Sequence, residues 1–153
     1  MKILLVEDNE IKLNKISAFV KEMVTVLEMV EVRSYTAAVK KIRSDTFDLV
    51  ILDMSLPTYE RGGAESGGRT RTFGGKEVAL RLQRKNRNTP FLVLTQFDGF
   101  QDGERYIDLE NLGAILKKDC GKSYLGLIKY GAINNNWKNE LRSIVESVGG
   151  LDV

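Results

Sequence analysis

Acidic, hydroxyl and amine side chains stand in this 153-residue chain where short apolar runs end. These side chains are Glu7, Asp8, Asp53, Thr95 and Lys118. Carboxylates brought together repel one another and need a cation, and a hard divalent ion such as Mg²⁺ meets that need with oxygen ligands. Such a metal can bind one oxygen of a phosphoryl group, while the Lys118 ammonium and the Thr95 hydroxyl contact its other oxygens. A carboxylate there can serve as the phosphoryl nucleophile, with positioning and charge neutralisation supplying most of the catalysis.

The apolar runs themselves predict buried β-strands. They cover residues 3–6, 29–32, 49–52, 91–94 and 114–116. Continuous apolar runs are typical of strands covered on both faces, as in a parallel sheet between helices. In an open parallel sheet, ligands bind beyond the carboxyl ends of the strands, so the polar residues named above are expected to share one edge.

Helical periodicity fills the gaps between these runs. The expected helices cover residues 11–24, a segment after a Ser34 N-cap, residues 76–85, a segment from Tyr106 to a Gly113 C-cap, and a last helix around Trp137 and Leu141. The alternation of strands and helices predicts right-handed crossovers and a three-layer α/β domain.

Two stretches interrupt the alternation. Residues 58–75 hold six of the fourteen glycines and match neither the Walker pattern nor the dinucleotide fingerprint, so we expect an inserted flexible loop. Residues 120–136 are apolar enough to pack but show no clear element. The prediction is a single domain over residues 1–148 with a short tail at 149–153 and no output domain.

Composition excludes several classes of function. The chain has no histidine, which removes Ser-His-Asp catalysis and histidine-based zinc sites, and its single cysteine, Cys120, removes an internal disulfide. A net charge of +2 gives no reason to expect direct nucleic-acid or membrane binding. No signal peptide or membrane span is predicted, and a cytoplasmic protein is expected.

The ordered motifs resemble those of a receiver domain of the two-component response regulators. The fragments that carry the resemblance are Ile-Leu-Leu-Val-Glu-Asp-Asn at 3–9, Leu-Asp-Met-Ser-Leu-Pro at 52–57, Leu-Thr at 94–95 and Leu-Lys-Lys-Asp at 116–119. Each fragment alone is weak, but their order at predicted strand ends is specific. The resemblance implies a flavodoxin-like, doubly wound sheet of five parallel strands in the order 2-1-3-4-5.

The resemblance also implies a role for each site residue. Asp53 would be the phosphoacceptor, and Thr95 the switch hydroxyl that turns toward the phosphoryl group. Lys118 would pair with that group, with Lys117 as an alternative. Mg²⁺ would be bound by Glu7, Asp8, Asp53 and the backbone carbonyl of Ser55.

Departures from the family pattern surround these residues. Gln96 follows the switch threonine where the family usually has a small residue, and Ile115 stands where the switch aromatic is expected. Asp119 replaces the proline that commonly follows the lysine. The long loop after Pro57 can gate the acceptor or bind a partner.

The expected function is a phosphorylation switch rather than a separate metabolic enzyme. A histidine kinase or phosphotransfer protein would phosphorylate Asp53, and an unknown downstream protein would respond to a monomer or weak homodimer. One alternative is a phosphorylation-independent pseudo-receiver. Another is a Mg²⁺-dependent phosphohydrolase, ranked last because Ser55 stands where an acid/base aspartate is needed. Glu7 and Asp8 can also be plain helix caps, and Lys118 plain surface charge.

Overall fold

The computed structural model describes residues 1–25, 27–60, 67–131 and 135–149. Its centre is a five-stranded parallel sheet in the order β2-β1-β3-β6-β9, which confirms the predicted flavodoxin-like arrangement. The sheet strands are β1 (Lys2–Val6), β2 (Glu28–Val32), β3 (Leu49–Leu52), β6 (Phe91–Thr95) and β9 (Tyr124–Lys129). The helices are α1 (Glu10–Met23), α2 (Tyr35–Ser44), α3 (Gly74–Lys85), α4 (Leu109–Cys120) and α5 (Asn136–Ser147).

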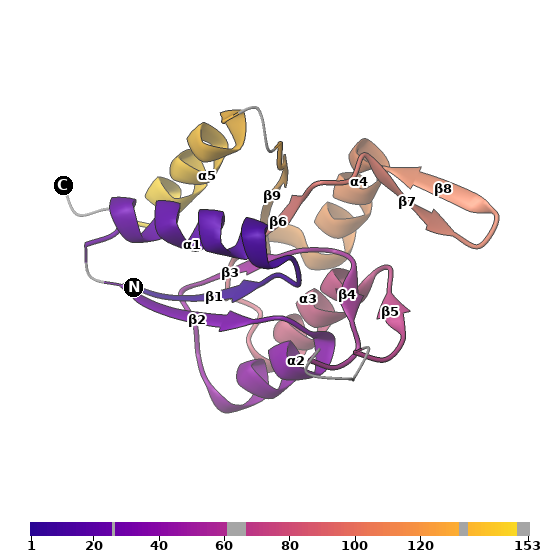
Figure 1. Cartoon of the computed structure of the whole chain (residues 1–153), viewed down its shortest axis with the longest axis horizontal. Coiled ribbons are helices and arrows are strands. Elements are labelled where there is room, and N and C mark those ends of the chain that lie inside the picture. The colour runs from indigo at the N-terminus through magenta and orange to yellow at the C-terminus, as the bar shows by residue number, and fades with distance from the viewer. Residues whose placement is uncertain (26, 61–66, 132–134, 150–153) are drawn as a thin grey trace.

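Helices cover both faces of the sheet (Figure 1). On one face, α1 and α5 pack against the side chains of Ile3 and Leu5, and on the other α2, α3 and α4 pack against Leu4 and Val6. Successive side chains of a strand point to opposite faces, so the continuous apolar runs of β1, β3 and β6 fill two cores at once. Among the described residues, no helix is long and apolar enough to cross a membrane.

Polar side chains fix where three of the helices begin. The Asn9 side chain accepts a hydrogen bond from the Lys12 backbone N–H at 3.0 Å, so α1 begins directly beyond the end of β1. Ser34 caps α2 in the same way, as predicted, and Asp108 caps α4. These caps place the turns of the carboxyl edge close to the strand ends.

The fifth strand is the main correction to the sequence prediction. Residues 114–116 lie inside α4, so the strand expected there is wrong, as is the expected end of that helix at Gly113. Buried Leu112, Leu116 and Cys120 recur every four residues, which is a helical spacing. The fifth strand is β9, which lies in the stretch that showed no clear element in the sequence.

Two small antiparallel ladders accompany the sheet. Within the predicted 58–75 loop, β5 (Thr70–Arg71) pairs with β4 (Leu56–Pro57); residues 61–66 of that loop, and 150–153 of the tail, lie outside the described residues. A hairpin of β7 (Gly99–Asp102) and β8 (Arg105–Asp108) follows β6 and projects away from the sheet (Figure 1). Tyr106 of this hairpin was predicted to be helical.

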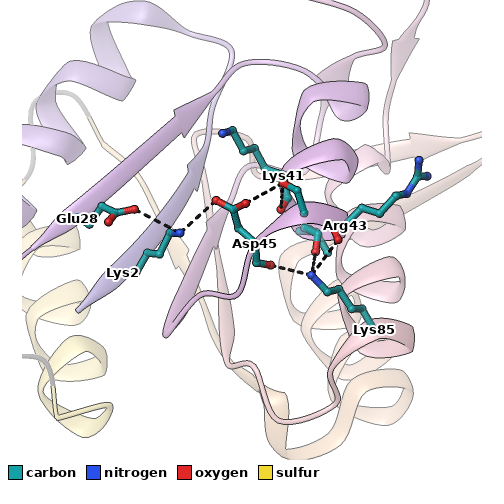
Figure 2. A network of polar contacts seen from close by, with 8 residues as sticks. Lys2, Glu28, Lys41, Arg43, Asp45 and Lys85 are labelled. Atoms are coloured by element: carbon teal, nitrogen blue, oxygen red, sulfur yellow. Dashed lines mark hydrogen bonds and ion pairs between the residues drawn. The ribbon is translucent and has the colours of Figure 1, made fainter.

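A polar network fastens the amino edge of the sheet (Figure 2). Lys2 Nζ lies 3.1 Å from an Asp45 carboxylate oxygen and 3.3 Å from a Glu28 oxygen. Lys85 Nζ donates to the backbone carbonyls of Ile42, Arg43 and Asp45, which end α2 or directly follow it. The Ser44 hydroxyl and then the Lys2 ammonium hold the pKa of the Asp45 carboxyl below its usual value. This edge is opposite to the one that carries the candidate site.

Candidate functional site

The carboxyl edge of the sheet brings together three of the predicted site residues. Glu7 directly follows β1, Asp53 directly follows β3 and Thr95 is the last residue of β6. All three are buried, with relative exposures of 2%, 6% and 0%. Asp8 lies beside Glu7 and is half-buried, and Ser55 is half-buried two residues beyond Asp53. Buried acids of this kind need a compensating charge.

Backbone contacts fix the position of Asp53. Its N–H donates to the Val6 carbonyl at 2.9 Å, which continues the β1–β3 pairing by one residue. Its Oδ1 accepts a hydrogen bond from the Met54 backbone N–H at 2.7 Å. The carboxylate is therefore held against the sheet edge before any ligand arrives.

The start of α3 packs directly on this backbone. The Gly75 N–H donates to the Met54 carbonyl at 2.8 Å. A Cβ atom at Gly75 would lie 2.2 Å from the Asp53 carbonyl oxygen and 2.9 Å from the Met54 Cα, which is closer than real atoms come. Only glycine permits this approach, so the end of the predicted loop helps to position the Asp53 backbone.

Lys12 is a site residue that the sequence reasoning missed. Its side chain is 2% exposed, and its Nζ lies 3.0 Å from Glu7 Oε2 and 3.6 Å from Asp53 Oδ2. The same Nζ donates to the Leu94 carbonyl at 2.8 Å. The available signal was its place four residues before Ile16, on the apolar stripe of α1, where a charged residue needs a specific partner.

Burial gives Glu7 unusual acid–base behaviour. Desolvation and then the neighbouring Asp53 carboxylate raise the pKa of Glu7 to about 8, while the Lys12 ammonium acts in the opposite direction. At the carboxyl edge, burial and the neighbouring Asp53 carboxylate thus disfavour the charged form of Glu7. A cation beside the two carboxylates relieves this repulsion.

Lys129 takes the place in the sheet where Lys118 was expected. It ends β9, and it is the Cα partner of Thr95 in the β6–β9 ladder. Its Nζ lies 2.9 Å from an Asp98 carboxylate oxygen and donates to the Gln96 carbonyl. The Thr95 hydroxyl oxygen accepts a hydrogen bond from the Phe97 N–H at 3.2 Å.

Lys117 and Lys118 are not part of this group. Both are exposed in the last turn of α4. A positive charge is favourable there because it interacts with the negative carboxyl end of the helix dipole. Their displacement follows from the wrong strand at 114–116. Ile115, expected as the counterpart of the switch aromatic, packs half-buried from α4 against the core instead.

The donor chemistry of the edge suits Mg²⁺. Glu7, Asp8 and Asp53 supply the carboxylate oxygens that this ion prefers, and Ser55 adds a carbonyl close by in sequence. Within the described residues, however, no three acidic, histidine or cysteine side chains gather as a ready metal site. The cation that contacts two of the acids is the Lys12 ammonium.

Comparison with known proteins identifies the family. Residues 3–125 match the response regulator receiver domain, which is most of the chain. The chain belongs to the receiver domain family. The receiver match agrees with the sheet order and with the acids found at its carboxyl edge.

Individual receivers resemble the chain over almost its whole length. It is 24% identical over 143 residues to the Detocs response regulatory protein DtcB of Enterobacter cloacae, covering 92% of this chain and 95% of DtcB. The non-phosphorylated HemR receiver domain from Leptospira biflexa has a TM-score of 0.63 at 22% identity, covering 99% and 96% of the two chains. The receiver of the sensor histidine kinase PA1611 from Pseudomonas aeruginosa, with magnesium in its active-site cleft, has a TM-score of 0.60 at 18% identity and covers 97% of each chain.

Proposed function

We propose that this receiver accepts a phosphoryl group on the Asp53 carboxylate from a histidine kinase or phosphotransfer protein. The observation that supports this most directly is the position of Asp53, buried at the end of a central strand between Glu7 and Thr95. In the transfer, the bond from phosphorus to the donor nitrogen breaks and a bond to an Asp53 oxygen forms. The donor nitrogen keeps the electron pair.

The surrounding residues support this chemistry in different ways. Asp53 is oriented by the Met54 N–H, and Thr95 is a hydroxyl donor at the neighbouring strand end. We assign the role of the phosphoryl-pairing lysine to Lys129 rather than Lys118, because Lys129 is paired with Thr95 across the β6–β9 ladder. Glu7, Asp8, Asp53 and the Ser55 carbonyl would hold Mg²⁺, which neutralises charge on the phosphoryl oxygens when it is bound.

The output would run through protein contacts. Thr95 is joined through its hydroxyl to Phe97, at the base of the β7–β8 hairpin. Phe97 in turn packs on Phe100 of that hairpin, with ring centroids 5.9 Å apart. A change at Thr95 therefore reaches a surface element within a few residues, and we propose this surface as the one a downstream protein reads.

The test is intact-mass spectrometry after incubation with acetyl phosphate and Mg²⁺. We expect one phosphoryl adduct in the wild type and none in Asp53→Asn. Asp48→Asn is the matched control, because Asp48 is exposed at the amino edge of the sheet. Labelling that persists in Asp53→Asn contradicts the assignment.

The second candidate is a phosphorylation-independent pseudo-receiver. Its specific support is Lys12, which already places a positive charge against Asp53. This candidate predicts no adduct in the same experiment. It also predicts equal partner affinity for the wild type and Asp53→Asn.

A further inference from the structure

The ammonium of Lys12 is buried inside the acidic site and is fully partnered there. It contacts the Glu7 carboxylate at 3.0 Å, the Leu94 carbonyl at 2.8 Å and the Asp53 carboxylate at 3.6 Å. It also lies 5.6 Å from the centre of the Tyr130 ring. A lysine with this many acceptors is held in place rather than directed to solvent.

These partners explain how the charge of Lys12 is tolerated in the interior, and their identity matters for the site. Lysine normally keeps its charge in water and buries only its stem, and a buried charge is tolerated where paired acceptors compensate for desolvation. Here the acceptors are the two acids at the ends of β1 and β3. The ammonium therefore neutralises the same oxygens that a divalent cation would use.

We propose that Lys12 is a resident counter-ion that competes with Mg²⁺ for the Glu7 and Asp53 carboxylates. This inference rests on the proposed function, because it assumes that these acids bind the metal. Two cations next to the same carboxylates repel each other. Mg²⁺ must therefore either displace the ammonium or bind beside it with a lower affinity. Lys12 makes the metal-free site stable and raises the Mg²⁺ concentration at which the site fills.

The first test measures Mg²⁺ affinity by isothermal titration calorimetry, without any phosphodonor. Lys12→Gln removes the charge and keeps an N–H donor for the Leu94 carbonyl. We expect it to bind Mg²⁺ tighter than the wild type by about tenfold or more, which corresponds to ~1.4 kcal/mol. Lys15→Gln is the matched control, because Lys15 is exposed on the same helix, and its affinity should equal that of the wild type.

The outcomes separate this inference from the proposed function. Equal or weaker affinity in Lys12→Gln overturns the role of Lys12, while phosphorylation of Asp53 can still be observed by mass spectrometry. Lack of Mg²⁺ binding by wild type and variant alike overturns both the competition and the metal site. If Lys12→Gln is unfolded alone and folds on addition of Mg²⁺, the metal has replaced the missing charge, which supports the inference.

A second measurement uses the wild type and does not depend on how the variant folds. The Nζ signal of Lys12 is followed by ¹⁵N NMR during a Mg²⁺ titration, with the exposed Lys15 signal as reference. We expect the Lys12 signal to shift or to broaden as the metal binds. A Lys12 signal that stays unchanged while the signals of Glu7 and Asp53 move overturns the inference.

Discussion

Thr95 and Lys129 are Cα partners at the ends of the adjacent strands β6 and β9. This pairing sets the two residues at the same level of the sheet, with Thr95 on the strand next to β3, whose end carries Asp53. Lys129 is held meanwhile by Asp98 and the Gln96 carbonyl, both in the segment that directly follows Thr95. The lysine and the threonine are thus linked through one short turn.

The first prediction separates Lys129 from Lys118. Lys129→Met should slow labelling of Asp53 by acetyl phosphate by roughly 100- to 1000-fold, the range for loss of one donor to developing charge. Lys118→Met should label at the wild-type rate, because Lys118 is exposed on α4. Time-resolved intact-mass spectrometry gives both rates. If only Lys118→Met were labelled more slowly, the phosphoryl-pairing lysine would be Lys118 rather than Lys129.

The second prediction concerns the contact between Gly75 and the Asp53 backbone. A Cβ there would overlap the Asp53 carbonyl, so Gly75→Ala should lower the free energy of unfolding by about 1–3 kcal/mol. Gly113→Ala is the control, because Gly113 lies within α4 and meets only the Tyr124 hydroxyl at 3.3 Å. It should be neutral or stabilising by up to about 1 kcal/mol. Urea denaturation measures both, and a stable Gly75→Ala would refute the tight approach.

The third prediction follows from the raised pKa of Glu7, about 8 in the folded chain against 4.5 for an ordinary glutamate. The folded state then holds the Glu7 proton more tightly than the unfolded state does. This contribution to stability is fully present below about pH 4.5 and is lost as the pH rises through about 8.

Urea denaturation from pH 5 to 8, with EDTA present, tests this direction. The wild type should lose stability with rising pH more steeply than Glu7→Gln, which cannot titrate. Identical slopes in the two proteins would show that Glu7 has an ordinary pKa.

The fourth prediction concerns the network at the amino edge. Lys85→Met removes the ammonium from three carbonyls at the end of α2 and should lower the free energy of unfolding by about 1 kcal/mol. Lys40→Met, at an exposed position on α2, should change it little. Labelling of Asp53 should be unchanged in both variants, since the network lies at the opposite edge. A labelling defect in Lys85→Met would contradict that separation.

The sequence predicted the sheet best where the strands are central. The strands β1, β3 and β6 are continuous apolar runs, and Glu7, Asp53 and Thr95 lie at their ends as the sequence predicted. The strand β9 lies at the edge, is mostly half-buried, and contains Gly126 with φ 151° beside an irregularity in its ladder. The glycine interrupts its apolar residues, so this strand lacks the continuous apolar run that marked the others.

The wrong prediction of a strand at 114–116 also led to the wrong lysine, Lys118, being placed at the end of the fifth strand. Ala114, Ile115 and Leu116 read as a short apolar run, but they belong to a helix whose buried positions recur every four residues. The hairpin before that helix has a turn signal in the sequence: Gly103 and Glu104 form its two-residue turn, and Gly103 has φ 61°. The contacts of Lys12 could not be predicted from the sequence, because its partners come from the ends of three different strands, which only the folded structure brings together.

If Thr95 moves, the β7–β8 hairpin would behave as a lever arm that pivots beside the site. Its base adjoins Thr95, and its inner ring, Phe100, bears on both Phe97 and Phe73, the residue that precedes α3. A rotation at the fulcrum moves the far tip through a longer arc than the base. A small displacement beside Asp53 would then become a larger one at the tip of the hairpin, by a factor that the length of the hairpin sets.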